Sequence, residues 1–187
     1  MKYEVSDRLY CDEVFILSTA IIDITLFLLF NIVYVTIAFS LSGLSFSFFG
    51  TFYAWQLLCL LTIQSYFQMW AAAGKNTADA TTKSMPIMIL FLLFNGFFVT
   101  KNTVVSWMLW AIYCSPLFYF IQQVSVTLFD DGTSKDDPNY LSSGQYVIDY
   151  YDFEDMAEVA AVVLICETVL FRVLQVVFLK TMNNLDR

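Results

Sequence analysis

The sequence has 187 residues, of which 59% are hydrophobic and 14% are charged, and its mean hydropathy is +0.66. Soluble domains carry about a quarter charged residues, so this composition excludes a soluble domain and indicates an integral membrane protein with several spans. The net charge of −8 gives no reason to expect a nucleic-acid partner, and the absence of histidine removes the usual central group of Ser-His enzymes, zinc hydrolases and histidine-ligated haem proteins. The four cysteines show no CxxC spacing, so we expect neither a metal site nor a redox pair, and no catalytic residue stands out.

The chain begins with a polar segment that is followed by two long apolar runs. Residues 1–13 are typical of an amphipathic segment at a membrane surface, or of an ordinary solvated terminus. Residues 14–39 form the first predicted span and residues 46–73 the second, because each exceeds the ~20 residues that a crossing helix needs. One face of the second span carries three amides, at Gln56, Gln64 and Gln68. Such a stripe predicts either hydrogen bonds to a neighbouring helix or the wall of a cavity.

The third apolar run and the stretch after it decide the topology. Residues 84–100 form a third span, which is short unless its helix begins around Thr81. Residues 104–129 are apolar enough for a fourth crossing, but Pro116 divides them into halves of about 12 residues. Helices of that length fit a re-entrant hairpin that returns on the same side as well as they fit one kinked crossing.

The distribution of positive charge favours the re-entrant hairpin. If residues 104–129 return, six cations lie on one side, at Lys2, Arg8, Lys75, Lys83, Lys180 and Arg187, against two on the other, at Lys101 and Lys135. If they cross, the division is five to three. Because cytoplasmic loops are enriched in Lys and Arg, we expect both termini in the cytoplasm and an acidic outer loop over residues 130–155, which holds eight of the seventeen acids.

The last predicted span, residues 156–180, carries two ionisable side chains, Glu167 and Arg172. Charges inside a membrane are costly and usually have partners. Arg172 lies about eight residues from the inner end of this span and Asp23 about nine residues from the inner end of the first, so both lie at ~12 to 14 Å depth. We therefore predict an intramembrane ion pair between Asp23 and Arg172. The alternative is that Arg172 extends to the cytoplasmic interface.

Several local motifs resemble those of a known family. The segments are RLYCDEVFILSTAIID (8–23, with Arg8 and Tyr10), AAAGKNTADA (71–80), NGFFV (95–99), SWMLWAIYCSPLFY (106–119), and Phe171-Arg172 followed by Leu179. Together with the order of spans, they resemble the C-terminal part of the transmembrane domain of G-subfamily ABC transporters. This group includes the pleiotropic drug resistance exporters and has an ABC-2 type transporter domain. The resemblance covers about residues 6–185.

The resemblance implies ATP-driven transport by alternating access, typically export of lipids, sterols or amphipathic xenobiotics. It makes residues 1–13 a cytoplasmic connecting helix and implies that Ile89 and Leu92 line the central cavity. Gly96, Phe97 and Phe98 take the place of the apolar outer gate, and a dry constriction of large side chains suits an apolar cargo. The implied partners are a second transmembrane half, nucleotide-binding domains that hold ATP and Mg, and the lipid bilayer, most simply that of the plasma membrane.

The chain also departs from that family. Many relatives have Pro near the position of Thr25, and nothing here matches the phosphate-binding pattern GxxxxGK[ST], since Gly74-Lys75 is followed by Asn76. The resemblance therefore implies no ATPase activity for this chain alone and a partial domain, either a fragment or one whose missing parts are on another polypeptide.

Two alternative interpretations place the chain in other functional classes of membrane protein. One is a non-transporting four-span membrane scaffold, and the other is an intramembrane aspartyl enzyme that uses Asp23 and Glu167, which lack a flanking motif. The expected fold is an all-α polytopic membrane protein, one transmembrane domain over residues 1–187, with four transmembrane helices, a re-entrant helical hairpin and an acidic extracellular loop.

Overall fold

The computed structural model describes residues 12–43, 46–130, 137–138, 141 and 143–181, and each regular element in these residues is a helix. In chain order they are α2 (Asp12–Ser42), η1 (Phe46–Phe48), α3 (Phe49–Ala73), α4 (Thr77–Leu93), η2 (Ser106–Met108), α5 (Leu109–Tyr113), α6 (Pro116–Phe129), α7 (Gly144–Tyr151) and α8 (Ala157–Thr181). The predicted surface segment 1–13 lies, apart from its last two residues, outside the described part of the chain.

Among the described residues, three helices are long and apolar enough to cross a membrane: α2, the continuous η1–α3 segment, and α8. A fourth crossing results if the bent pair formed by residues 106–113 and α6 is counted as one span. The prediction of an all-helical polytopic membrane protein is therefore confirmed, with three to four candidate spans.

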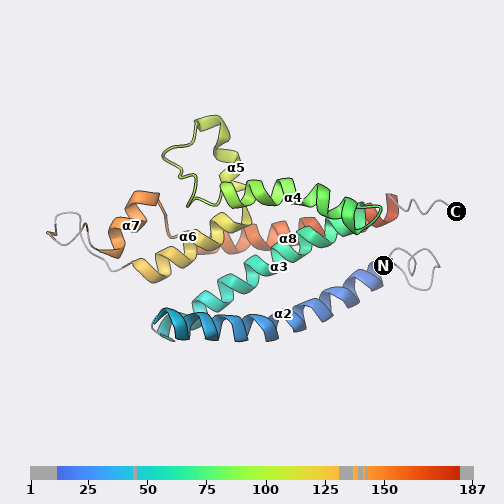
Figure 1. Ribbon diagram of the computed structural model, residues 1–187, viewed down its shortest axis with the longest axis horizontal. Coiled ribbons are helices and arrows are strands. Elements are labelled where there is room, and N and C mark those ends of the chain that lie inside the picture. Colours follow the sequence, from blue (N-terminus) through green and yellow to red (C-terminus); the bar gives the residue numbers. More distant parts are fainter. Residues whose placement is uncertain (1–11, 44–45, 131–136, 139–140, 142, 182–187) are drawn as a thin grey trace.

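Helices α2 and α3 form an antiparallel hairpin (Figure 1). The buried positions of α2 are Asn31, Val35 and Phe39, and their spacing of four places them on one stripe that faces α3. Near the turn, the Phe39 ring lies 5.7 Å from that of Phe49 and 5.2 Å from that of Phe52. The other faces of α2 are largely exposed and apolar, so they suit contact with lipid or with further helices.

Helix α4 occupies a different stretch from the predicted span 84–100. It begins at Thr77, where the Asn76 side chain accepts a hydrogen bond from the Asp79 N–H at 2.9 Å, and it ends at Leu93. Pro86 therefore lies inside the helix. The helix ends seven residues earlier than predicted because the chain turns over residues 94–100.

The break at Pro116 is confirmed: the helices on either side meet at 82°. Ser115 is the extended residue before α6, and Pro116 occupies its first turn, where its missing N–H is not needed. The Ser115 hydroxyl donates to the Phe91 carbonyl of α4 at 3.0 Å, so the corner is attached to α4.

The two ends of the bundle carry different elements (Figure 1). The start of α2, the α3–α4 turn and the end of α8 lie at one end, whereas the end of α6 and the whole of α7 lie at the other. Helix α7 lies within the stretch 130–155 that was predicted as a loop, and Ser143 caps it by accepting a hydrogen bond from the Tyr146 N–H at 3.4 Å.

Candidate functional site

The two predicted cavity residues lie on one uncovered face of α4. Ile89 is 54% exposed and Leu92 is 46% exposed, and their spacing of three places them side by side with Met85. The opposite side of α4 packs on α3, where the Tyr66 hydroxyl donates to the Ser84 carbonyl at 2.6 Å. The exposed face is therefore a continuous apolar strip that α3 does not cover.

The predicted gate residues follow directly after α4 in a tight turn. The Asn95 side-chain oxygen accepts hydrogen bonds from the backbone N–H of Phe97 at 2.9 Å and of Phe98 at 3.2 Å. Gly96 has a φ of +83°, and a Cβ there would lie 2.7 Å from the Phe118 ring. Only glycine fits this backbone, so the turn presents both Phe97 and Phe98, 51% and 69% exposed, at the end of the α4 strip.

The last residue of α7 and the residues after it hold the gate turn from the other side. The Phe97 ring stacks on Tyr151 with centroids 5.2 Å apart, and Tyr151 stacks on Phe153 at 5.4 Å. Lys101 donates to the Asp152 carbonyl at 3.0 Å, and its ammonium lies 5.3 Å from the centre of a ring in α6. We call residues 95–101, 118 and 151–153 the outer aromatic cluster.

Sequence reasoning missed the partners of the gate in this cluster. Lys101 entered only as a positive charge, and Tyr151 only as part of a loop. The signal available was the aromatic density of YVIDYYDF at residues 146–153, which is unusual for a solvated loop.

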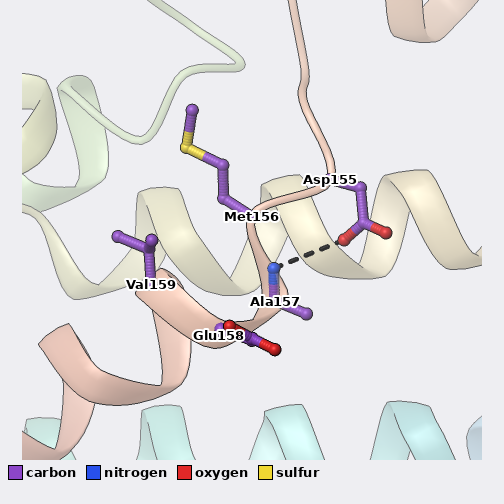
Figure 2. Close-up of a pocket in the computed structure, with 5 residues that line it drawn as sticks. All are labelled: Asp155, Met156, Ala157, Glu158 and Val159. Carbon is purple, nitrogen blue, oxygen red and sulfur yellow. Dashed lines mark hydrogen bonds between the residues drawn. The ribbon is translucent and has the colours of Figure 1, made fainter.

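Two buried glutamines of α6 fix the chain where it enters α8. Gln122 donates to the Glu154 carbonyl. With the oxygen and nitrogen of its amide assigned from their neighbours, Gln123 donates to the Asp155 carboxylate at 3.3 Å and accepts from the Met156 N–H at 3.0 Å. Asp155 also accepts from the Ala157 N–H at 3.3 Å, at the first turn of α8. Figure 2 shows this turn, in which the Asp155 side chain points away from that of Met156. A pocket of about 410 Å³ lies over these residues.

A row of polar side chains joins α3 to α8 inside the bundle. The Thr62 hydroxyl lies 2.9 Å from that of Thr168 and 3.2 Å from the Leu164 carbonyl. Further along, Arg172 donates to the side-chain oxygen of Gln68 and, at 3.3 Å, to that of Gln175. We call residues 62, 68, 168, 172 and 175 the polar seam.

The predicted ion pair between Asp23 and Arg172 stays a prediction. Asp23 lies within α2, but its side chain is outside the described part of the structure. Arg172 is half-buried and has amide partners on α3 and on its own helix. The amide stripe of α3 thus supplies, through Gln68, one of the predicted hydrogen bonds to a neighbouring helix.

Comparison with known proteins decides the family. The sequence model of the ABC-2 type transporter family matches residues 1–129, more than two thirds of the chain. This chain belongs to the ABC-2 type transporter family. The resemblance inferred from the motifs, including its G-subfamily and drug-resistance relatives, is therefore confirmed.

The relatives of this ABC-2 chain are much longer proteins. ABC transporter G family member 8 of Dictyostelium discoideum is 26% identical over 156 residues, which are 81% of this chain and 25% of that protein. ABC transporter G family member 42 of Arabidopsis thaliana is 26% identical over 185 residues, which are 94% of this chain and 13% of the relative. Pleiotropic drug resistance protein 2 of Nicotiana plumbaginifolia is 30% identical over 80 residues, 41% of this chain and 6% of the relative.

This ABC-2 chain also has an apolar groove of about 420 Å³ between α4 and the η2–α5 segment. Its lining residues are Ile87, Leu90, Phe91, Phe94, Met108, Trp110, Ala111 and Cys114. None of these side chains carries a charge, so the groove suits the apolar part of a lipid or an amphipathic molecule.

Proposed function

We propose that this ABC-2 chain is the transmembrane part of an ATP-driven exporter that moves lipids, sterols or amphipathic xenobiotics across the plasma membrane. The α4 strip with Ile89 and Leu92 lines the path, and Phe97 and Phe98 form its outer gate. The observation that carries the proposal is the position of the two phenylalanines, at the end of the exposed strip in a chain of a transporter family.

Charge and hydrogen bonding support the gate. No described residue of the turn 94–100 carries a charge, and large apolar side chains exclude water and ions yet separate for an apolar molecule. The backbone of the turn is fixed by Asn95, whereas both gate rings remain exposed. A second transmembrane half that presents the same surface would cover these rings and close the path between the two strips.

The proposed topology places both termini in the cytoplasm and the acidic segment with α7 outside the cell. The 82° corner at Pro116 supports a re-entrant hairpin, because two helices that meet almost at right angles are poorly suited to one crossing. Under this topology α4 is the remaining crossing helix. Its start carries Asp79 and Lys83 and lies at the cytoplasmic surface, and its apolar part, residues 84–93, reaches ~15 Å into the hydrocarbon core.

The ATP and Mg that drive transport would be held by nucleotide-binding domains, which the chain's own residues do not resemble. No phosphate-binding loop matches the sequence, and no group of three possible metal ligands occurs among the described residues. We therefore place ATP hydrolysis on a domain outside these 187 residues.

The decisive experiment is ATP-dependent uptake into inverted membrane vesicles by the transporter that contains this domain. The probes are rhodamine 6G, as an amphipathic drug, and a phosphatidylcholine with a fluorescent acyl chain. The unaltered transporter is expected to accumulate at least one of them in the presence of ATP and Mg. No ATP-dependent accumulation of either probe would contradict the proposed export function.

The double variant Phe97→Ala and Phe98→Ala tests the proposed gate independently of the proposed export function. Net accumulation is expected to fall several-fold because the probe leaks back through an open gate, and the leak without ATP is expected to rise. Phe129→Ala, which removes another exposed ring at the end of α6, is the matched control and is expected to transport normally. Normal transport by the double variant would overturn the gate and leave the export function standing.

A further inference from the structure

A second groove lies between α2 and α3. It has a volume of about 350 Å³ and is lined by Phe27, Phe30, Asn31, Tyr34, Gln56 and Leu60. Phe30 is 71% exposed and Tyr34 is 58% exposed, whereas Asn31 is only 2% exposed. The aromatic residues therefore form the rim of the groove, and the Asn31 amide lies at its floor.

The Asn31 amide has no hydrogen-bond partner among the described residues. Both its side-chain oxygen and its side-chain nitrogen are buried and unbonded. Buried polar atoms in native proteins are bonded in the large majority of cases, so an orphaned amide that lines a groove calls for an explanation. A ligand with one hydrogen-bonding group would supply what the helices do not.

The depth of the groove limits what that ligand is. Asn31 lies four to five residues from the centre of the apolar run 14–39, so it lies about 7 Å from the middle of the span. Phospholipid headgroups lie ~15 Å from that plane, since the hydrocarbon core is ~30 Å thick. The hydrogen-bonding group must therefore belong to a molecule that carries it into the hydrocarbon core.

We propose that the α2–α3 groove binds a neutral lipophilic molecule with a single hydroxyl or carbonyl group, which Asn31 recognises. The ligand is neutral because no described lining side chain carries a charge that could compensate one. Its apolar body lies against Phe27, Phe30 and Leu60, and Gln56 lies beside its polar group. The volume falls within the range of small-molecule pockets, about 300–1,000 Å³.

This site is separate from the proposed path. No residue of α4 or of the outer aromatic cluster lines the groove. Binding in the α2–α3 groove therefore does not depend on export and can be tested by a binding measurement alone.

Photolabelling of the full 187-residue chain in phosphatidylcholine nanodiscs tests the site. The probe is a long-chain alcohol that carries a diazirine, and the matched probe is the same molecule without its hydroxyl. Mass spectrometry of the labelled peptides is expected to find the alcohol on residues 27–34 and 56–60. The alcohol is expected to label them about fivefold more than the alkane, the ratio that one net hydrogen bond supplies.

Asn31→Leu is expected to reduce this alcohol-to-alkane ratio to about one, because the amide is the only group that it removes. Replacement of an unbonded buried amide by an apolar side chain is not expected to impair folding. Gln56→Leu tests the second amide and is expected to lower the ratio less. Thr36→Val is the control, because the Thr36 hydroxyl is exposed and bonds its own helix at the Ile32 carbonyl, 2.7 Å away.

Three results would overturn the proposal. Equal labelling by alcohol and alkane would show that Asn31 recognises nothing, and an unchanged ratio in Asn31→Leu would place the recognition elsewhere. Labelling that vanishes when the same probes are used on the longer transporter would show that another helix covers the groove, so its occupant would be protein and not a small molecule.

Discussion

The polar seam and the outer aromatic cluster hold the same bundle together by different physical means. The seam joins α3 to α8 through hydroxyls and amides, as in the contact of Thr62 with Thr168. The outer aromatic cluster joins the turn after α4 to the end of α7 and the turn that follows it through stacked rings, and Lys101 supplies a single polar bond to Asp152. One region depends on hydrogen-bond geometry, and the other depends on burial.

The two kinds of contact stabilise the bundle in different environments. Inside a bilayer, lipid tails are as apolar as the side chains, so burial gives little drive for helix association and polar contacts must select the partner. Near the membrane surface water is present, and burial of aromatic rings is favourable as in a soluble protein. The seam is thus suited to a permanent helix pair. Under the proposed topology, the outer aromatic cluster lies near the membrane surface and is suited to contacts that form and break around the proposed gate.

Removal of the central ring of the outer aromatic cluster is expected to have the largest effect on stability. Phe118 is 1% exposed and contacts Gly96, Lys101 and Tyr119. Phe118→Ala is expected to lower the free energy of unfolding by about 3–5 kcal/mol, measured by denaturant titration in mixed micelles. Phe129→Ala, on a residue that is 44% exposed, is the control and is expected to change it by less than about 0.5 kcal/mol. A small effect of Phe118→Ala would show that water does not reach this region.

The addition of a single methyl group to the turn at Gly96 is expected to have the next largest effect on stability. Gly96→Ala forces a side chain onto a left-handed residue and against the Phe118 ring, so it is expected to destabilise by about 1–3 kcal/mol. Gly50→Ala, in the first turn of α3, meets open space and is expected to stabilise by about 0.5–1 kcal/mol. Thermal unfolding of the two variants side by side measures the opposite signs. Equal effects would mean that the turn relaxes at no cost.

The sequence predicted the parts of this architecture that depend on local patterns. The long apolar runs located α2, α3 and α8, and Pro116 located the 82° corner, because span length and proline geometry are properties of a few neighbouring residues. The end of α4 could also have been predicted from neighbouring residues. Asn95-Gly96 is a turn signal, and greater weight on it would have ended the helix before residue 100.

Contacts between segments far apart in the sequence could not be predicted from such local patterns. Tyr151 meets Phe97, and Lys101 meets Asp152, across about fifty residues of chain, and no period or spacing reports such a pair. Charge suggested an acid, Asp23, as the partner of Arg172, and that pair stays a prediction; the structure adds an amide partner, Gln68, which charge alone does not suggest. Charge and depth restrict the choice of partner, but tertiary packing selects it.

A double-mutant cycle on Thr62 and Thr168 measures how much their hydrogen bond contributes to the polar seam. Thr62→Val, Thr168→Val and the combined variant isolate the hydroxyl pair, and the coupling is expected to be about 0.6 kcal/mol and at most about 1.7 kcal/mol. Thr62→Ser keeps the hydroxyl and is expected to retain the coupling. A coupling near zero, measured in mixed micelles, would mean that the neighbouring carbonyl of Leu164 replaces the lost partner.

The smallest expected effect lies at the exposed start of α4, outside both regions. Hydrogen bonds from the Lys83 ammonium and from the Lys75 N–H hold the pKa of Asp79 below its ordinary 3.8. Because the folded pKa is the lower one, the carboxylate contributes stability that is complete above the unfolded pKa and is lost as the pH falls through the folded pKa.

Asp79→Asn is therefore expected to unfold at a slightly lower temperature than the unaltered chain at neutral pH. The difference is expected to vanish once the pH falls below the folded pKa, which lies below 3.8. Lys83→Met is expected to reduce this pH-dependent difference, because it removes the first of the two hydrogen bonds. The effect is small since the pair is exposed to solvent, which weakens ion pairs. A difference between Asp79→Asn and the unaltered chain that persisted in acid would show that Asp79 acts there as a neutral cap of α4, in which case its charge contributes nothing to stability.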